Sequence, residues 1–374
     1  MYPFNPQHRI IKRVTESSSK PNMQINAFSQ FSSWQTDLTS FDYSLFSIPE
    51  WIESFDDKKN YPVYFDFVHD GETVGKMAGL ILENNTPIRR KLFFHAGPAL
   101  KKGVSEQYHV GCLQALISYA RHHHMGRICM LSYDFKSQIK TDKDFFVYPR
   151  YEYVIPLSGS KEEVAGAISS EVKRRYRKAV EGGFSIQEVN TPEMIEALIG
   201  LMQTTKHVRT MKGYSEYNPF YIPHFNKAVL MKLLLKNALR VFVASQDNQI
   251  YGIDAVMVKD LKAYGLLMGF TEKGYRFAMP SFINYYIIMK LKSEGFGYLN
   301  MGGISMDLTH QGLRLFKKSL GAVPCISTFG ETNYLSFPLR LLNPLLNARR
   351  LMNEYKAKPA FQRLSHISIW KQRK

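Results

Sequence analysis

One order of elements occurs twice in this chain, and the repeat limits the folds that the sequence can adopt. In each half the hydrophobic pattern predicts a hairpin, a third strand, a long helix and a short strand, without evident residue identity between the halves. The first copy comprises 61–67, 73–82, 90–95, 104–124 and 127–132, and the second comprises 239–244, 250–258, 261–270, 278–293 and 296–301. A duplicated α/β unit is therefore expected, with two similar domains side by side.

The segments around the repeat set the expected domain organisation. We expect an irregular N-terminal arm over 1–30, a first repeat domain over 31–160, a second over 161–337 and a basic C-terminal helical tail over 338–374. A strand is predicted at 151–157 and a single basic helix at 162–181. The connection 191–238 holds two ordinary helices and no heptad pair long enough for a coiled-coil arm.

The composition is that of a folded chain. Of 374 residues, 45 % are hydrophobic, so a core can form without disulfides or metals. No run approaches the roughly 18 apolar residues that span a bilayer, and the first residues lack the order of a secretory signal. Residence in the cytoplasm is expected, and Cys112, Cys129 and Cys325 are expected to be buried small apolar residues.

The chain is strongly basic, with a net charge of +17. Its last segment, 338–374, carries nine Lys or Arg and one acid, and so supplies +8 of that charge. This density is typical of proteins that contact phosphates, in tRNA, in nucleotide-linked substrates or on an anionic membrane. A solubilising surface is the other interpretation.

Several catalytic signatures are absent from the sequence. It contains no phosphate-binding loop of P-loop type, no dinucleotide-binding glycine pattern, no His-Glu-x-x-His and no Gly-x-Ser-x-Gly. The adjacent histidines 122–124 end a predicted helix and point in different directions, so no metal site is expected there. The expectation is an enzyme or binding protein without a metal or cofactor of its own.

Two segments combine basic residues with features that suit anionic ligands. The segment 173–178 places five cations on one helix, which favours either phosphate contact or a solvated face. A predicted strand ends in Gly302 and Gly303, which allow close approach of a ligand to the backbone, and 311–321 then forms a short basic helix. A plain strand-turn-helix connection is the alternative for this second segment.

Four short motifs lie in a fixed order along the chain. They are Phe31-x-x-Trp34, Phe94-His95-Ala96-Gly97-Pro98, the basic helix 174–178 with Ala179 and Gly182, and Gly302-Gly303 with Gly312-Leu313-x-x-Phe316-Lys317-x-x-x-Gly321. In this order they resemble the FemABX family of bacterial aminoacyltransferases, which add amino acids from aminoacyl-tRNA to peptidoglycan precursors. The resemblance covers about residues 30–345. It implies an α/β (α+β) fold of two tandem GNAT-like acyltransferase domains, without a coiled-coil arm.

The resemblance also implies roles for individual residues. Lys317 is similar to the family's lysine near the transferred acyl group and the donor phosphates, and is the expected catalytic residue. Arg209 is similar to an arginine that grips the acceptor's phosphate, and Tyr264 to a tyrosine that lines the acceptor cavity. The other expected substrate-binding residues are Tyr214, Gly302, Gly303, Arg175 and Arg177.

The sequence also departs from the family pattern. Family members often carry an Asp shortly after the Gly-Pro pair, where this chain has Lys101 and Lys102, and Asn300 stands where an Asp often precedes the paired glycines. An aminoacyl ester is already activated, however, so positioning the amine and stabilising the developing oxyanion supply much of the rate without a protein nucleophile.

Three functions are therefore expected, in this order. The first is a FemABX-like transfer of an aminoacyl group from aminoacyl-tRNA to a peptidoglycan precursor, in cell-wall biogenesis and cell shape, in the cytoplasm or at the inner face of the membrane. The second is an N-acyltransferase that uses acyl-CoA or an acyl carrier protein in polysaccharide or lipid tailoring, for which 274–278 partially echoes the pyrophosphate loop. The third is a non-catalytic binder of RNA or of a membrane surface, through the amphipathic segment 341–356.

Overall fold

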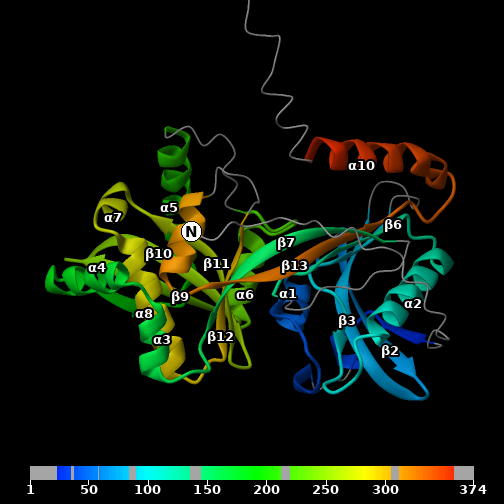
Figure 1. Cartoon of the computed structure of the whole chain (residues 1–374), viewed down its shortest axis with the longest axis horizontal. Coiled ribbons are helices and arrows are strands. Elements are labelled where there is room, and N and C mark those ends of the chain that lie inside the picture. Colours follow the sequence, from blue (N-terminus) through cyan, green and yellow to red (C-terminus); the bar gives the residue numbers. More distant parts are fainter. Residues whose placement is uncertain are drawn as a thin grey trace, which may run out of the picture.

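The strands of the chain join into one mixed sheet that runs through both halves (Figure 1). The computed structural model describes residues 23–34, 38–57, 59–83, 90–134, 145–211, 220–304 and 311–357. Among them, 13 strands form the sheet in the order β1-β2-β3-β4-β6-β13-β7-β12-β11-β10-β9-β8, with β5 paired to β3. Helices such as α2, α5 and α8 pack on this sheet, as Figure 1 shows.

The first half contains the predicted hairpin, third strand, helix and short strand. The strands β2 and β3 pair antiparallel, β4 pairs antiparallel with β3, and β6 lies parallel to β4. The elements of this half are β1 (Gln24–Phe28), η1 (Phe31–Ser33), η2 (Leu38–Ser40), η3 (Leu45–Ser47), α1 (Pro49–Ser54), β2 (Asn60–His69), β3 (Glu72–Leu82), β4 (Lys91–Phe94), β5 (Ala99–Leu100), α2 (Tyr108–His122) and β6 (Arg127–Leu131).

The second half repeats this order, as predicted. Antiparallel β9, β10 and β11 are followed by the long helix α8 and by β12, which lies parallel to β11. The elements are α3 (Lys161–Ala167), α4 (Ser170–Glu181), β8 (Ser185–Glu188), α5 (Pro192–Met211), α6 (Lys227–Leu235), β9 (Leu239–Gln246), β10 (Gln249–Lys259), β11 (Lys262–Phe270), α7 (Glu272–Arg276), α8 (Met279–Ser293), β12 (Tyr298–Ile304) and α9 (Gln311–Ser319).

Two long strands join the halves. The strand β7 (Phe145–Pro156) pairs with β12 and also with β13 (Val323–Thr332), and β13 continues to β6 of the first half. Side chains from both halves also share one hydrophobic cluster, in which Trp51 and Leu80 belong with Leu230 and Leu267. Because strands and core are shared, the division at 160/161 stays a prediction.

Two expected elements are wrong in detail. The arm expected to be irregular over 1–30 contains β1, which pairs antiparallel with β2, where Ile25 packs on the core of the first half. The single helix expected over 162–181 is two helices, because Ile168 is extended and the Ser169 side chain accepts a hydrogen bond from Val172 N to begin α4. Residues 1–22 lie outside the described part.

The remaining expectations concern the connection, the cysteines and the chain end. Helices α5 and α6 pack on the strands β11 and β9 and on each other. Cys112 is buried as expected, whereas Cys129 and Cys325 are partly exposed. The chain end forms η6 (Leu339–Leu342) and α10 (Asn343–Ala357), and residues 358–374 lie outside the described part. In the described ranges, no helix has the length and apolarity that a membrane span requires.

Candidate active site

A gap in the parallel pairing of β11 and β12 is the centre of the site. These strands pair only over Lys262↔Tyr298, Ala263↔Leu299 and Tyr264↔Asn300, and the pairing does not continue beyond. On its other edge β12 carries a bulge, since its register with β7 jumps from Asn300↔Val154 to Gly303↔Glu152. Gly302 within the bulge has φ +73°, a conformation that favours glycine.

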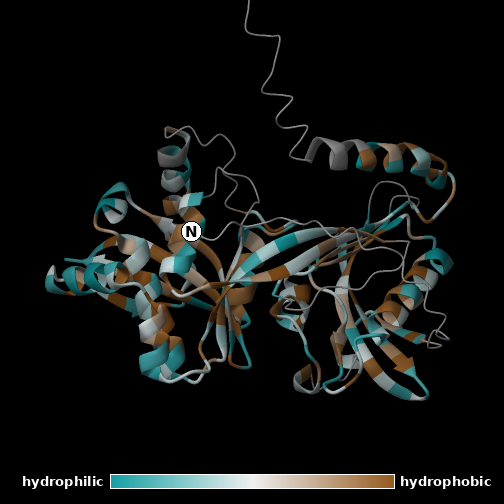
Figure 2. Ribbon diagram, viewed as in Figure 1, coloured by the Kyte–Doolittle hydropathy of each residue, from teal (hydrophilic) through white to brown (hydrophobic). Residues whose placement is uncertain are grey.

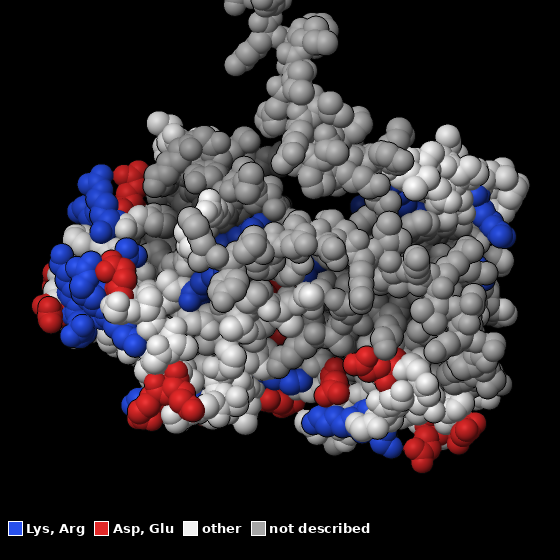
Figure 3. All heavy atoms as spheres, in the orientation of Figure 1, with Lys and Arg blue, Asp and Glu red and all other residues white. Residues whose placement is uncertain are grey.

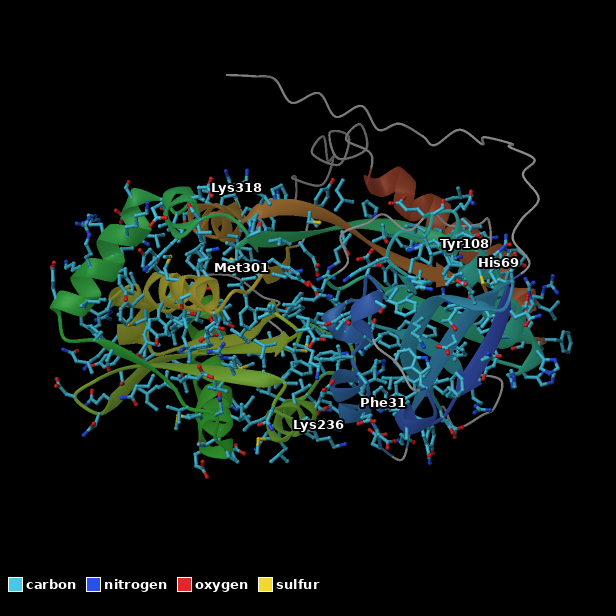
Figure 4. All side chains as sticks on the ribbon, turned by 90° about the horizontal axis from the view of Figure 1, so that it is seen from below. Phe31, His69, Tyr108, Lys236, Met301 and Lys318 are labelled. Atoms are coloured by element: carbon cyan, nitrogen blue, oxygen red, sulfur yellow. The ribbon has the colours of Figure 1, made fainter. Side chains whose placement is uncertain are left out.

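Lys317 holds this bulge from the helix α9. Its ammonium donates to the carbonyl oxygens of Met301, Gly302 and Gly303 at 2.7, 2.9 and 3.2 Å. The side chain is 5 % exposed, and burial lowers its pKa from 10.5 to about 7. The next residue, Lys318, lies exposed at the outer surface (Figure 4). The structure thus brings three predicted site residues, Lys317, Gly302 and Gly303, into direct contact.

A buried network of polar side chains supports the bulge from the side of β7. Glu152, 1 % exposed, accepts hydrogen bonds from Asp134 N and from Asn300 Nδ2, both at 2.9 Å, and from the Tyr264 hydroxyl at 3.3 Å. Asn300 in turn accepts from Gly302 N at 2.8 Å. Burial and the neighbouring Glu152 raise the pKa of Asp134 to about 6. The network therefore fixes the backbone that carries the paired glycines.

Arg150 and two tyrosines flank the same bulge. The Arg150 guanidinium lies 3.9 Å from the centre of the Tyr133 ring, and its Nη1 is 3.2 Å from Glu152 Oε1. A Cβ atom at Gly303 would lie 2.7 Å from Arg150 Nη2, so the second glycine is what lets this side chain cross the strand. At Gly302 a Cβ atom would lie 3.1 Å from the hydroxyls of both Tyr221 and Tyr264.

On the side of α8 and α9, a small cavity opens beside the gap. Its volume is about 40 Å³, and the described residues that line it all belong to the second half. Lys317, Asp254 and Asn284 are its titratable or amide lining residues. The others are Val256, Gly265, Met268, Ile287, Leu299, Met301, Leu313 and Phe316.

A larger basic groove lies between α4 and the turn that precedes α8, with a volume of about 580 Å³. Four cations and three aromatic rings line it, together with five further residues: Arg174, Arg175, Lys178, Arg276, Phe184, Tyr275, Phe277, Glu171, Ala179, Gly182, Gln246 and Ala278. Glu171 holds both Arg174 and Arg175 in place. Lys and Arg gather over α4 at the left edge of Figure 3, and the same helix is hydrophilic in Figure 2.

The other predicted residues are distributed around these features. Arg175 lines the groove, whereas Arg177 is exposed on α4 and is not part of the groove lining. Tyr264 is fully buried on β11. Arg209 belongs to α5, of which only the backbone is described at this position, and Tyr214 lies outside the described residues.

Sequence reasoning missed Arg150, Glu152, Asp134 and Asp254. The signal for Glu152 and Asp254 was present, because each is a lone acid within a run of apolar or aromatic residues predicted as a buried strand. Such an acid is almost never buried without a partner, and its position could therefore have been marked as a site.

The chain is similar to one family model and to several solved structures. Residues 168–310 match the family model described as "Acetyltransferase (GNAT) domain", and no curated protein matches the chain in sequence. The crystal structure of FemX is similar, with a TM-score of 0.60 at 13 % identity over 77 % of this chain and 92 % of that one. Weaker similarity, at a TM-score of 0.45 and 12 % identity, links the chain to L-PGS from Bacillus licheniformis (82 % and 98 % covered) and to a tandem GNAT protein from the clavulanic acid biosynthesis pathway (75 % and 85 %).

These findings confirm the predicted resemblance at the level of the fold. The chain has the fold of FemX, and its second half carries a GNAT domain. The predicted α/β class with GNAT-like domains and the predicted acyltransferase class are thereby confirmed.

Proposed function

We propose that this acyltransferase takes an aminoacyl group from aminoacyl-tRNA and transfers it to an amine of a peptidoglycan precursor. The observation that carries the proposal is the groove, in which four cations lie beside three aromatic rings. The end of an RNA strand offers phosphates to arginine and lysine, and unstacked bases to aromatic rings. The sequence resemblance to FemABX aminoacyltransferases supports the same donor.

The groove and the β11–β12 gap are connected through α8. Ala278, at the start of this helix, lines the groove, and Asn284 lines the cavity beside the gap. Six residues of helix separate them, a rise of about 9 Å. In this proposal a donor lays its phosphates along α4 and extends its terminal ester along α8 toward Lys317.

The chemistry at the gap is aminolysis of an ester. The acceptor nitrogen attacks the ester carbonyl carbon, the carbonyl oxygen becomes an oxyanion, and the ribose oxygen then leaves with a proton from the amine. A positive charge and backbone N–H groups at the oxyanion lower this barrier, and holding the two reactants together contributes further. In this proposal Lys317 is the catalytic residue and acts through its nearby positive charge, because its three ammonium hydrogens already bind the carbonyls of the bulge that Gly302 and Gly303 form.

The acceptor is proposed to lie on the opposite side of the bulge. There Arg150 presents a guanidinium whose Nη1 is ion-paired with Glu152 Oε1 at 3.2 Å and makes no hydrogen bond among the described residues. A guanidinium of this kind suits the phosphates or carboxylates of a peptidoglycan precursor. Tyr264 lies beside it, and Arg209 and Tyr214 are proposed as further acceptor contacts on the basis of the resemblance alone.

An acyl-CoA donor is the second candidate, and the size of the groove favours it. A volume of about 580 Å³ is within the range of pockets that hold small cofactors. The groove is also lined by Tyr275–Ala278, within the segment that partially echoes a pyrophosphate loop. The same cations would then hold the phosphates of CoA.

Parallel binding of both donors distinguishes these candidates. We expect the protein to bind aminoacylated tRNA more tightly than uncharged tRNA, with an affinity that falls steeply with salt. Arg175→Gln should weaken tRNA binding and reduce the salt slope by about one, whereas Lys102→Gln, an exposed charge change in the first half, should leave the affinity near that of the wild type. Saturable binding of CoA, together with equal binding of aminoacylated and uncharged tRNA, would instead favour the CoA donor.

The chain end is proposed to contact an anionic membrane. Phe337, Leu341 and Leu345 are 74, 69 and 69 % exposed, and Arg340 lies among them. Apolar side chains next to cations suit the interface of an anionic bilayer. Sedimentation with vesicles of anionic lipid should retain the protein, and Leu341→Asp should release it. Equal sedimentation of the wild type and the variant would refute this contact.

A further inference from the structure

A buried acid in the middle of the second half has an oxygen without a partner. Asp254 lies on β10, between Phe242 of β9 and Met268 of β11, and is 2 % exposed. In the described part of the chain, its Oδ1 accepts no hydrogen bond. Burial raises its pKa to about 7. An unsatisfied carboxyl at such a place destabilises the fold, and its presence requires another explanation.

Among the described residues, the side-chain hydrogen bond to this acid is weak. Asn284 Nδ2 donates to Asp254 Oδ2 at 3.4 Å, and the same nitrogen donates to Pro280 O at 3.0 Å. The two N–H groups of this amide are thus shared between its own helix and Asp254 Oδ2, and neither reaches Oδ1. Asp254 is left with capacity to accept hydrogen bonds from a group that the folded chain does not provide.

Asp254 lines the cavity beside the β11–β12 gap. Apart from Lys317 and Asn284, the other lining side chains are apolar, including Val256 and Leu313, so a ligand would meet a carboxyl at one end and mostly hydrocarbon elsewhere. A water-sized group needs about 10–15 Å³ of such volume. A cavity of about 40 Å³ therefore takes roughly three heavy atoms.

We propose that this cavity receives the α-ammonium and the small side chain of the transferred aminoacyl group, and that Asp254 accepts hydrogen bonds from that ammonium. The inference rests on the proposed aminoacyl transfer and adds the recognition of the donor's amino acid. An ammonium supplies the donors that Asp254 Oδ1 lacks, and the apolar walls fit a hydrogen, methyl or hydroxymethyl side chain.

Two features assign the cavity to the donor rather than to the acceptor. The described residues that line it all belong to the second half, which also carries the basic groove. Lys317 forms part of its wall and at the same time binds the bulge carbonyls, so the cavity opens beside the proposed reacting carbonyl. The acceptor-side groups, such as Arg150, do not line it.

Transfer from donors with and without a free α-amine tests the proposal. The donors are glycyl-, alanyl- and seryl-tRNA and the same tRNAs after N-acetylation of the amino acid. We expect the wild type to prefer the free amine, and Asp254→Asn, which keeps the shape, to lower kcat/KM for free-amine donors about 10- to 100-fold with little change for acetylated donors. A loss that is equal for both donor types, or no loss, would overturn the proposal.

A second variant places a side chain in the cavity from β11, the strand beside the one that carries Asp254. A Cβ atom at Gly265 would meet only Asn300 O, at 3.8 Å, so larger side chains enter the cavity without a backbone clash. Gly265→Val should retain the fold and exclude alanyl and seryl donors more strongly than glycyl donors. Unchanged selectivity among the three donors in a folded Gly265→Val protein would contradict the assignment.

Binding of a small probe separates failure of this inference from failure of the proposed function. Glycinamide carries the ammonium and acetamide does not, and neither requires tRNA. Saturable binding of glycinamide to the wild type, absent for acetamide and lost in Asp254→Asn, supports the amine subsite even when no charged tRNA is a donor. Equal binding of glycinamide to the wild type and to Asp254→Asn overturns it.

Discussion

The buried ammonium of Lys317 makes the free energy of unfolding depend on pH, and the substitution Lys317→Met removes this contribution. Burial lowers its pKa from 10.5 to about 7, although three carbonyl oxygens accept its hydrogen bonds. Each pKa unit corresponds to 1.36 kcal/mol, so keeping the charged form in the folded protein costs about 5 kcal/mol relative to the neutral amine. Lys317→Met removes the charge and keeps a long apolar stem.

The direction in which stability changes with pH follows from the number of protons bound by the folded and unfolded states. The folded-state pKa lies below the unfolded-state pKa, so between about pH 7 and 10.5 the unfolded chain binds one proton more. The free energy of unfolding of the wild type therefore rises with pH across this window relative to that of the variant. Below pH 7 both states are protonated, and the difference between the two proteins is constant.

Urea unfolding of both proteins at pH 7.5 and at pH 9.5 measures this effect. Over these two pH units the wild type should gain about 3 kcal/mol relative to Lys317→Met. Lys318→Met is the matched control, because Lys318 is exposed on the same helix. Its free energy of unfolding should differ from that of the wild type by the same amount at both pH values. A flat difference for Lys317→Met as well would refute the reasoning.

Three further outcomes are expected around the bulge. Lys317→Met should lower kcat for aminoacyl transfer at least 100-fold in a single-turnover assay while Lys318→Met stays near wild type, and equal losses would contradict the proposed role. Gly302→Ala should lower the free energy of unfolding by about 1–2 kcal/mol in urea melts, because φ is +73°; an unchanged midpoint would show that the position tolerates a side chain. Glu152→Gln should cost about 3–5 kcal/mol, because it leaves the Arg150 guanidinium without its carboxylate partner in a buried ion pair; a cost below 1 kcal/mol would show that the network is not tightly coupled.

Local patterns predicted the repeated units because they are coded within short stretches of sequence. The β2–β3 hairpin turns at Asp70 and Gly71, both with positive φ, which is the turn chemistry that the sequence displays. The strand β13 was not predicted. It carries Pro324 and several polar residues, and its register is set by β7, which lies far away in the sequence. A local pattern contains no information on such a partner.

The candidate site divides in the same way. Lys317, Gly302 and Gly303 belong to one compact motif, and the sequence resemblance identified them. Arg150 reaches the same bulge only because β7 pairs with β12 across the middle of the sheet. Its place in the site follows from the tertiary pairing, which explains why sequence reasoning did not find it.

The two halves keep one topology but differ at the place where the chemistry is proposed. In the first half β4 pairs with β6 along its whole length, from Lys91↔Arg127 to Phe94↔Met130, so that parallel pair has no gap. In the second half the equivalent pairing ends at Tyr264↔Asn300, and the glycine bulge follows. The proposed donor site lies where these strands part, and the first half has no equivalent opening between β4 and β6. This asymmetry matches the finding that the GNAT family model covers 168–310, and under the proposed function it leaves the first half to shape the proposed acceptor side through the shared strands β7 and β13.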